Sequence, residues 1–131
     1  MATLEQQRAL LAHHHVEKIS NESSDEDKKK YASIVHSMPA LLRAAGLSQA
    51  FHFVATRKNE AQRTLLDHFA EQLGRIDDTI TDAESLLKIV RNADLGRYLR
   101  LSQEAILCAD WYRRFVQGIL KIEAGEADVT D

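Results

Sequence analysis

The sequence predicts an all-α protein: a single compact bundle of six to seven helices around a long C-terminal helix. Only one proline and five glycines interrupt 131 residues, and helix-favouring side chains are abundant. Apolar residues recur every three or four positions and do not alternate, which is the spacing of one helix face. With 44% hydrophobic positions the chain can bury one core. We therefore expect one domain over residues 1–124 and an acidic, flexible tail over residues 125–131.

The first helix is predicted to begin at Thr3, which forms a capping box with Gln6. We expect it to end near Ser20. Residues 20–30 are polar and dense in charge, and we interpret them as a surface loop. The apolar positions of the helix lie at helical spacing and comprise Leu4, Leu10, Leu11, Val16 and Ile19.

A second capping signal lies inside this polar stretch, where Ser24 precedes Asp27 by three positions. The three lysines Lys28, Lys29 and Lys30 follow directly after three acidic residues. A basic binding patch and a solvated helix start both explain such a run, because opposite charges one turn apart stabilise a helix. The sequence leaves these two interpretations open.

The second helix is predicted to carry apolar positions from Tyr31 to Ala45, with Pro39 near its middle. Because proline removes a backbone donor and crowds the preceding turn, we expect a kink or a restart there. Gly46 is predicted to stop the helix in a left-handed conformation. Ser48 can then cap a short helix that bears Phe51, Phe53 and Val54 and ends in Arg57 and Lys58.

Two further helices precede the long one. Asn59 and Gln62 cap a helix that carries four large apolar residues, Leu65, Leu66, Phe69 and Leu73, and Gly74 closes it. Thr81 and Glu84 are predicted to cap a short helix with Leu86, Leu87, Ile89 and Val90. Asp94 then opens the long C-terminal helix.

This long helix is predicted over residues 94–123, about 45 Å at about 1.5 Å per residue. Its main apolar stripe consists of Tyr98, Leu101, Ala105, Cys108, Tyr112, Phe115, Ile119 and Ile122. A second apolar surface beside it adds Leu95, Leu99, Ile106, Ala109, Val116 and Leu120. We expect the helix to be enclosed on most sides. Only a narrow polar strip remains, formed by Arg100, Gln103, Asp110, Arg114, Gln117 and Lys121.

The sequence shows no catalytic set: no glycine-rich phosphate loop, no paired cysteines and no nucleophile elbow. The adjacent residues His13, His14 and His15 would point in three directions from one helix, and His68 and Glu71 stand in the reverse order of a di-metal motif. Cys108 lies on the apolar stripe, as a core residue would. We expect no enzyme, cofactor, metal or small-molecule substrate. Without a long apolar run or a signal peptide we expect no membrane partner and a cytoplasmic location.

The net charge of −3 argues against a general nucleic-acid binder, yet residues 43–64 and 94–121 are locally basic. Trp111 lies beside Arg113 and Arg114 at the edge of the apolar stripe. It is either a core-edge residue with solvated arginines or part of a face that meets a phosphate backbone or a partner subunit. The pattern alone does not decide between the two.

Three stretches together resemble one family, the small subunit of the type III-B CRISPR effector, the RNA-guided Cmr complex. Residues 3–8 (TLEQQR) are similar to its opening helix. Residues 39–53 (PALLRAAGLSQAFHF) resemble its proline-bearing helix, Gly-Leu stop and Gln-Ala-aromatic restart. Residues 98–115 resemble its Tyr-x-x-x-Thr/Ser-x-Glu-Ala segment followed by Trp-x-x-Arg-Phe.

The chain also departs from the family pattern. The family often has basic residues where this chain has Ala9 to His15, and often lysine where this chain has Tyr112 and Arg113. The first departure puts in doubt a contact between the opening helix and RNA. The fold expectation is unaffected by either.

The resemblance implies a non-catalytic subunit in antiviral defence that stacks, in several copies, beside the backbone subunits of the complex. It further implies that these copies line the channel for target RNA and help to hold the guide RNA–target RNA duplex. The rival interpretations are a helical protein–protein adaptor without RNA contact, or the small subunit of a related CRISPR effector type. From the basic segments we predict RNA-backbone contacts by Arg57, Lys58, Arg113 and Arg114, and secondarily by Arg43, Arg100 and Lys18.

Overall fold

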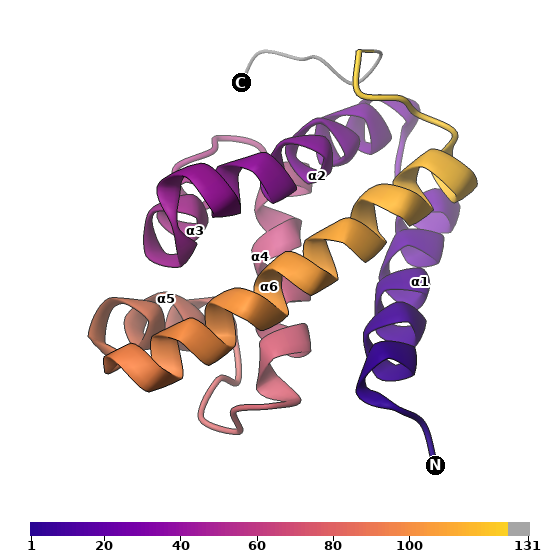
Figure 1. Cartoon of the computed structure of the whole chain (residues 1–131). Helices are drawn as coiled ribbons and strands as arrows, with labels where there is room; N and C mark the ends of the chain where they lie inside the picture. Colours follow the sequence, from indigo (N-terminus) through magenta and orange to yellow (C-terminus); the bar gives the residue numbers. More distant parts are fainter. Residues whose placement is uncertain (126–131) are drawn as a thin grey trace.

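The computed structural model describes residues 1–125, and these form six α-helices and one π-helical turn (Figure 1). The all-α prediction is confirmed. The helices are α1 (Leu4–Glu22), α2 (Asp25–Ala45), α3 (Leu47–Ala55), α4 (Glu60–Gly74), α5 (Ala83–Asn92) and α6 (Leu95–Phe115), followed by the π-helical turn η1 (Val116–Leu120). Most of the predicted acidic tail lies outside the described residues.

Helix α6 crosses the middle of the bundle, with α1 on one side, α2 and α3 on the other, and α4 behind it (Figure 1). Arg8 contacts Glu104, and His15, seven residues later on α1, contacts Tyr112, eight residues later on α6. The two helices therefore run parallel. Tyr112 also packs against Phe69 of α4, with ring centroids 5.5 Å apart. The apolar stripe of α6 is thus the centre of the core, as its spacing predicts.

Large side chains from every side fill this core. The largest that are fully buried include Tyr31, Met38, Phe51, Leu65, Phe69, Leu73, Leu86, Leu101 and Tyr112. Removing such apolar surface from water is the main stabilising term in folding. These residues come from α2, α3, α4, α5 and α6, and α1 adds Ala12, Val16 and Ile19, so one continuous core ties the six described helices to one another.

The predicted loop over residues 20–30 is wrong. Helix α1 continues to Glu22 and α2 begins at Asp25, so only two residues connect them. The Ser24 hydroxyl accepts a hydrogen bond from the Asp27 amide at 3.1 Å, which confirms the capping signal. Acidic residues in the first turn of α2 interact favourably with the positive end of the helix dipole. The dense charge therefore belongs to a helix start.

Of the predicted kink or restart at Pro39, the restart is wrong, because α2 runs without interruption from Asp25 to Ala45, and the kink stays a prediction. Proline costs this helix one hydrogen bond to the preceding turn. Pro39 is itself buried, and its neighbours Met38 and Leu42 are 1% and 2% exposed. Burial of this face outweighs the missing bond.

Gly46 has a φ of +89° and a ψ of 168°, a backbone conformation that favours glycine. Gly46 ends α2 as predicted, but its ψ of 168° lies outside the left-handed helical region, so the predicted left-handed conformation is wrong. Gly46 also begins α3, and the predicted Ser48 cap is wrong. The Ser48 amide instead donates to the Tyr98 hydroxyl at 3.1 Å, which ties the start of α3 to α6.

The cap of α5 lies one residue later than predicted. The Asp82 carboxylate accepts a hydrogen bond from the Ser85 amide at 2.7 Å, and the Ser85 hydroxyl accepts one from the Asp82 amide at 3.0 Å. Thr81 precedes this reciprocal cap. By contrast, Asn59 and Asp94 cap α4 and α6 as predicted, through Gln62 and Arg97 respectively.

The long helix is shorter and less enclosed than predicted. Its α-helical part ends at Phe115, and after η1 Lys121 adopts a left-handed conformation with φ 59°. Gly118 lowers helix propensity in this last stretch. Leu95 and Leu99 are 73% and 57% exposed, because the first turns of α6 lie at the edge of the bundle (Figure 1). Leu4 and Leu10 of α1 are exposed in the same way.

Candidate nucleic-acid interface

Arg113 and Arg114 lie exposed in the last turn of α6, beside a small aromatic cluster. The Arg114 guanidinium carbon lies 5.5 Å from the centroid of the Trp111 ring, within the range of a cation–π contact. Trp111 in turn stacks on Phe115 at 5.5 Å. His13 of α1 meets the edge of Phe115 at 5.2 Å. The aromatic cluster therefore packs α1 against α6 and holds one arginine over a half-buried tryptophan.

No carboxylate among residues 1–125 forms an ion pair with Arg113 or Arg114. Arg43 differs, because its guanidinium lies 3.5 Å from the Asp110 carboxylate and bridges α2 and α6. That pair is about half exposed on both sides, so water screens it strongly. The structure thus gives Arg43 a local partner within the bundle that Arg113 and Arg114 lack in this part of the chain.

The two remaining second-choice cations lie in mixed surroundings. Exposed Arg100 borders an open hollow of about 570 Å³ that also contains Arg75, Arg97, Asp77 and Asp78. Arg97 donates to the Asp77 carboxylate at 2.6 Å, and this hydrogen bond lowers the pKa of Asp77 to about 2. Part of the positive charge in this hollow is therefore already neutralised.

Lys18 is exposed on α1, where it borders a shallow hollow of about 260 Å³. The same hollow contains Glu17 and Glu22, so its charge is mixed. All residues that line this hollow belong to α1, and none of the other predicted cations is among them. Lys18 therefore stays a prediction from the sequence.

Arg57 and Lys58 follow the end of α3. The Arg57 guanidinium carbon lies 5.2 Å from the Phe53 ring centroid, and its Nε donates to the Gln62 Oε1 at 2.8 Å. Helix α3 meets α6 near Tyr98, and Arg113 lies about 22 Å further along that helix at 1.5 Å per residue. The structure therefore does not bring the two predicted pairs together on one patch.

A buried polar cluster between α1, α4 and α6, absent from the predictions, surrounds Glu104. This carboxylate is 5% exposed and accepts hydrogen bonds from Arg8 at 2.5 and 3.0 Å and from Arg75 at 3.1 Å. Burial acts to raise the pKa of Glu104, but the hydrogen bond and charge of Arg8 outweigh it and hold the pKa below its usual value. Its place three residues after Leu101 and four before Cys108 could have identified it as a stripe residue.

Two buried histidines form a second polar cluster. The rings of His15 and His68 stack with centroids 3.9 Å apart and planes within 7° of parallel. The Tyr112 hydroxyl lies 2.7 Å from His15 Nδ1, and the Tyr31 hydroxyl lies 2.7 Å from His68 Nδ1. Burial is the main cause that lowers the pKa of His68 to about 2, and it lowers the pKa of His15 as well. Both rings are therefore neutral near pH 7.

The Glu71 carboxylate sets the direction of this hydrogen-bond network. An ionised carboxylate can only accept, so His15 Nε2 donates to Glu71 across 3.2 Å and His15 Nδ1 is left as an acceptor. Tyr112 then donates its proton to His15 Nδ1 and accepts from Gln72 Nε2 at 3.2 Å. The network orients side chains of α1, α4 and α6.

Neither cluster resembles a metal centre. Across residues 1–125 no three His, Cys, Asp or Glu side chains are grouped closely enough to hold an ion. No helix in the same range is both long and apolar enough to cross a lipid bilayer.

Comparison with known proteins decides the family. The family model described as "CRISPR-associated protein (Cas_Cmr5)" matches residues 4–119. The chain is 35% identical over 105 residues to the CRISPR system Cmr subunit Cmr5 of Thermus thermophilus, covering 80% of this chain and 88% of that protein. The chain belongs to the Cmr5 family. This is the family of the small, non-catalytic subunit of the type III-B CRISPR Cmr complex.

A solved structure supports the same assignment. The crystal structure of a CRISPR-associated Cmr5 family protein from Thermus thermophilus superposes with a TM-score of 0.78 at 33% identity. The overlap covers 92% of this chain and 99% of that one. The Cmr5 assignment confirms the resemblance found in the sequence.

Proposed function

We propose that this Cmr5 family chain acts in the cytoplasm, in antiviral defence, as a stacking subunit of a type III-B effector complex. Several copies lie beside the backbone subunits and hold the guide RNA–target RNA duplex through contacts with its phosphates. The observation that carries the proposal is the exposure of Arg113 and Arg114, which no carboxylate of residues 1–125 neutralises. Neighbouring cations on a rigid helix give sequence-independent, salt-sensitive contacts with phosphates.

The modest acidity of the chain agrees with this role. A subunit that contributes only part of a composite groove needs a local positive surface, because the groove's potential is the sum over all subunits. The net charge of −3 therefore does not oppose binding by one face. Arg57 and Lys58 supply a second positive region, and Arg43, Arg100 and Lys18 are secondary candidates in mixed surroundings.

The test is retention of target RNA by the assembled complex. We expect Arg113→Ala combined with Arg114→Ala to weaken retention. The slope of log affinity against log salt concentration should fall in magnitude by about 0.9 for each phosphate contact with a duplex that is lost. Lys88→Ala with Arg91→Ala is the matched control, since it removes two exposed cations from α5. If both double variants retain target RNA as well as the unchanged chain at low and moderate salt, Arg113 and Arg114 belong to the fold or to subunit contacts.

A protein–protein adaptor is the competing function, and the exposed leucines Leu95 and Leu99 favour it. Apolar side chains one turn apart at the surface are typical of a contact with another protein. Photocrosslinking separates the two functions, because only a subunit that touches RNA crosslinks to target RNA within the complex.

A further inference from the structure

The start of α4 joins two cationic segments that are far apart in the sequence. Gln62 is fully buried there, and its Oε1 accepts from Arg57 Nε at 2.8 Å. Its Nε2 donates to the Lys30 carbonyl oxygen at 2.9 Å. One amide side chain therefore holds the segment after α3 against the first turns of α2. The backbone at the end of the lysine run before Tyr31 therefore lies close to the Arg57 guanidinium.

Two of the four cations in this region are accessible. Lys29 and Lys58 are exposed, and Lys30 is half-buried. Lys30 Nζ lies 3.2 Å from a Glu26 carboxylate oxygen, but Glu26 is 78% exposed, so water and salt screen this ion pair. A strong polyanion can compete with such a pair. We call Phe53, Arg57, Lys58, Lys29 and Lys30 the Phe53 surface.

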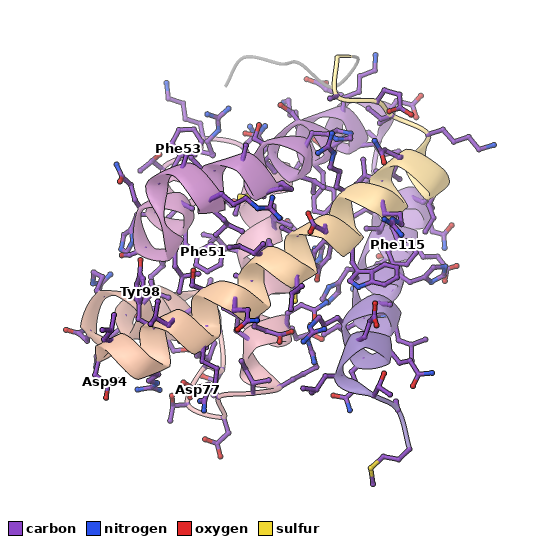
Figure 2. The ribbon with its side chains drawn as sticks, viewed as in Figure 1. Phe51, Phe53, Asp77, Asp94, Tyr98 and Phe115 are labelled. Atoms are coloured by element: carbon purple, nitrogen blue, oxygen red, sulfur yellow. The ribbon has the colours of Figure 1, made fainter. Side chains whose placement is uncertain are left out.

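Phe53 gives this surface an aromatic face. It is 42% exposed, whereas Phe51, two residues earlier on α3, is fully buried. Figure 2 shows Phe51 directed towards α6 and Phe53 directed away from the bundle. Phe53 therefore presents part of its ring to solvent. The Arg57 guanidinium lies over this ring, at 5.2 Å from its centroid, and Gln62 fixes its orientation.

We propose that the Phe53 surface binds single-stranded RNA, with one base stacked on Phe53 and the adjoining phosphates held by Arg57, Lys58 and the lysines of α2. Aromatic faces flanked by cations bind single strands without sequence preference, because every base has a π face. A duplex cannot use the ring, since its bases are stacked on one another. Gln62 is a positioning residue for Arg57. This inference rests on the proposed function and adds the strand type and the surface.

The first test measures binding of the isolated chain to a fluorescent oligouridine strand and to the same strand paired with oligoadenosine. We expect Phe53→Leu to weaken binding of the single strand about tenfold and binding of the duplex little. Lys58→Ala should lower the salt slope for the single strand by about 0.7. Both positions are solvent-exposed, so both variants should fold, and circular dichroism verifies that they do.

Lys88→Ala is the matched control for the loss of one exposed lysine, and it should leave both affinities unchanged. Gln62→Leu tests the positioning role, because it keeps the buried volume but frees Arg57 and the Lys30 carbonyl. We expect it to weaken single-strand binding when Arg57 is present and to have no further effect in an Arg57→Ala background. Equal affinity of Phe53→Leu and the unchanged chain for the single strand overturns the proposal.

The second test uses the assembled complex with a target RNA that carries 5-iodouridine, which crosslinks to stacked aromatic rings on irradiation. We expect a crosslink to Phe53 that is lost in Phe53→Leu. If Phe53→Leu and Lys58→Ala change nothing while Arg113→Ala with Arg114→Ala reduces retention, this inference fails and the proposed function stands. If neither set changes RNA retention or crosslinking, both fail. Loss of the subunit from RNA-free complex in Lys58→Ala would assign the surface to a protein neighbour and overturn the inference.

Discussion

Helix α6 carries charge in two different settings. Glu104, in its middle, is buried and shares its two oxygens between Arg8 and Arg75. Arg113 and Arg114, in its last turn, are exposed and face no carboxylate of residues 1–125. The buried charge is useful only if its partners stay in place, whereas the exposed charges are solvated without a carboxylate partner in residues 1–125. The comparison teaches that charge held inside serves the fold and that charge left outside is available to another molecule.

Breaking the buried cluster should have the largest effect on stability. In Glu104→Ala two partly buried guanidinium groups lose their carboxylate, which costs about 3–5 kcal/mol of the free energy of unfolding when one partner of a buried pair is removed. Urea unfolding followed by circular dichroism measures this. Gln103→Ala, at the exposed neighbouring position, should change stability by less than about 0.5 kcal/mol. A loss below about 1 kcal/mol for Glu104→Ala would show that water reaches the arginines.

Acidification should destabilise the same interior through its histidines. Burial lowers the pKa of His68 to about 2, so the folded chain stays unprotonated there while the unfolded chain takes up a proton below about pH 6.5. The stabilisation from neutral His68 is complete above pH 6.5 and is lost as pH falls towards 2. Between pH 7 and about pH 5 this amounts to about 2 kcal/mol.

His15 adds to the same trend, because burial lowers its pKa although the hydrogen bond to Glu71 acts in the opposite direction. Urea unfolding at several pH values between about 7 and 5 measures the sum. His68→Asn removes one titrating ring, and we expect its stability to fall about 2 kcal/mol less over this range. An unchanged pH slope in that variant would contradict the buried neutral ring.

The exposed cations should behave in the opposite way. Arg113→Ala with Arg114→Ala should lower the free energy of unfolding by less than about 1 kcal/mol, because within residues 1–125 the change removes a solvent-exposed contact between Arg114 and Trp111 and no ion pair. Target-RNA retention should fall in the same double variant. A thermal-unfolding midpoint measured beside retention separates the two effects, and a large loss of stability would place these arginines with Glu104 instead.

The spacing of apolar residues predicted the fold, because residues that recur every three or four positions form the helix face that packs into the core. The stripe through Leu101, Cys108 and Tyr112 lies in the core as predicted. Helix ends were predicted less well, since a cap depends on one hydrogen bond: Asp82 was missed beside Thr81. The dense charge near Asp25 was mistaken for a loop because a helix start and a solvated connection share the same composition.

The sites are harder to predict, for two physical reasons. Gln62 looked only like a cap partner, because the contact that gives it a second role comes from Lys30, on another helix. Glu104 fell on the apolar stripe but counts as charged by composition, and only its neighbours Arg8 and Arg75 explain its burial. Pairing across helices is invisible to local spacing, so polar clusters appear only once the helices are placed.

The smallest expected effect makes the comparison sharpest. Asp110 lies six residues after Glu104 on the same helix and also faces an arginine, Arg43, at 3.5 Å. Its side chain is 51% exposed, against 6% for Glu104. A double-mutant cycle with Asp110→Ala and Arg43→Ala should therefore give a coupling of about 0–1 kcal/mol, far below the loss in Glu104→Ala. A coupling as large as that loss would mean that burial does not separate the structural charges of α6 from the available ones, and the argument from exposure to RNA contact would lose its basis.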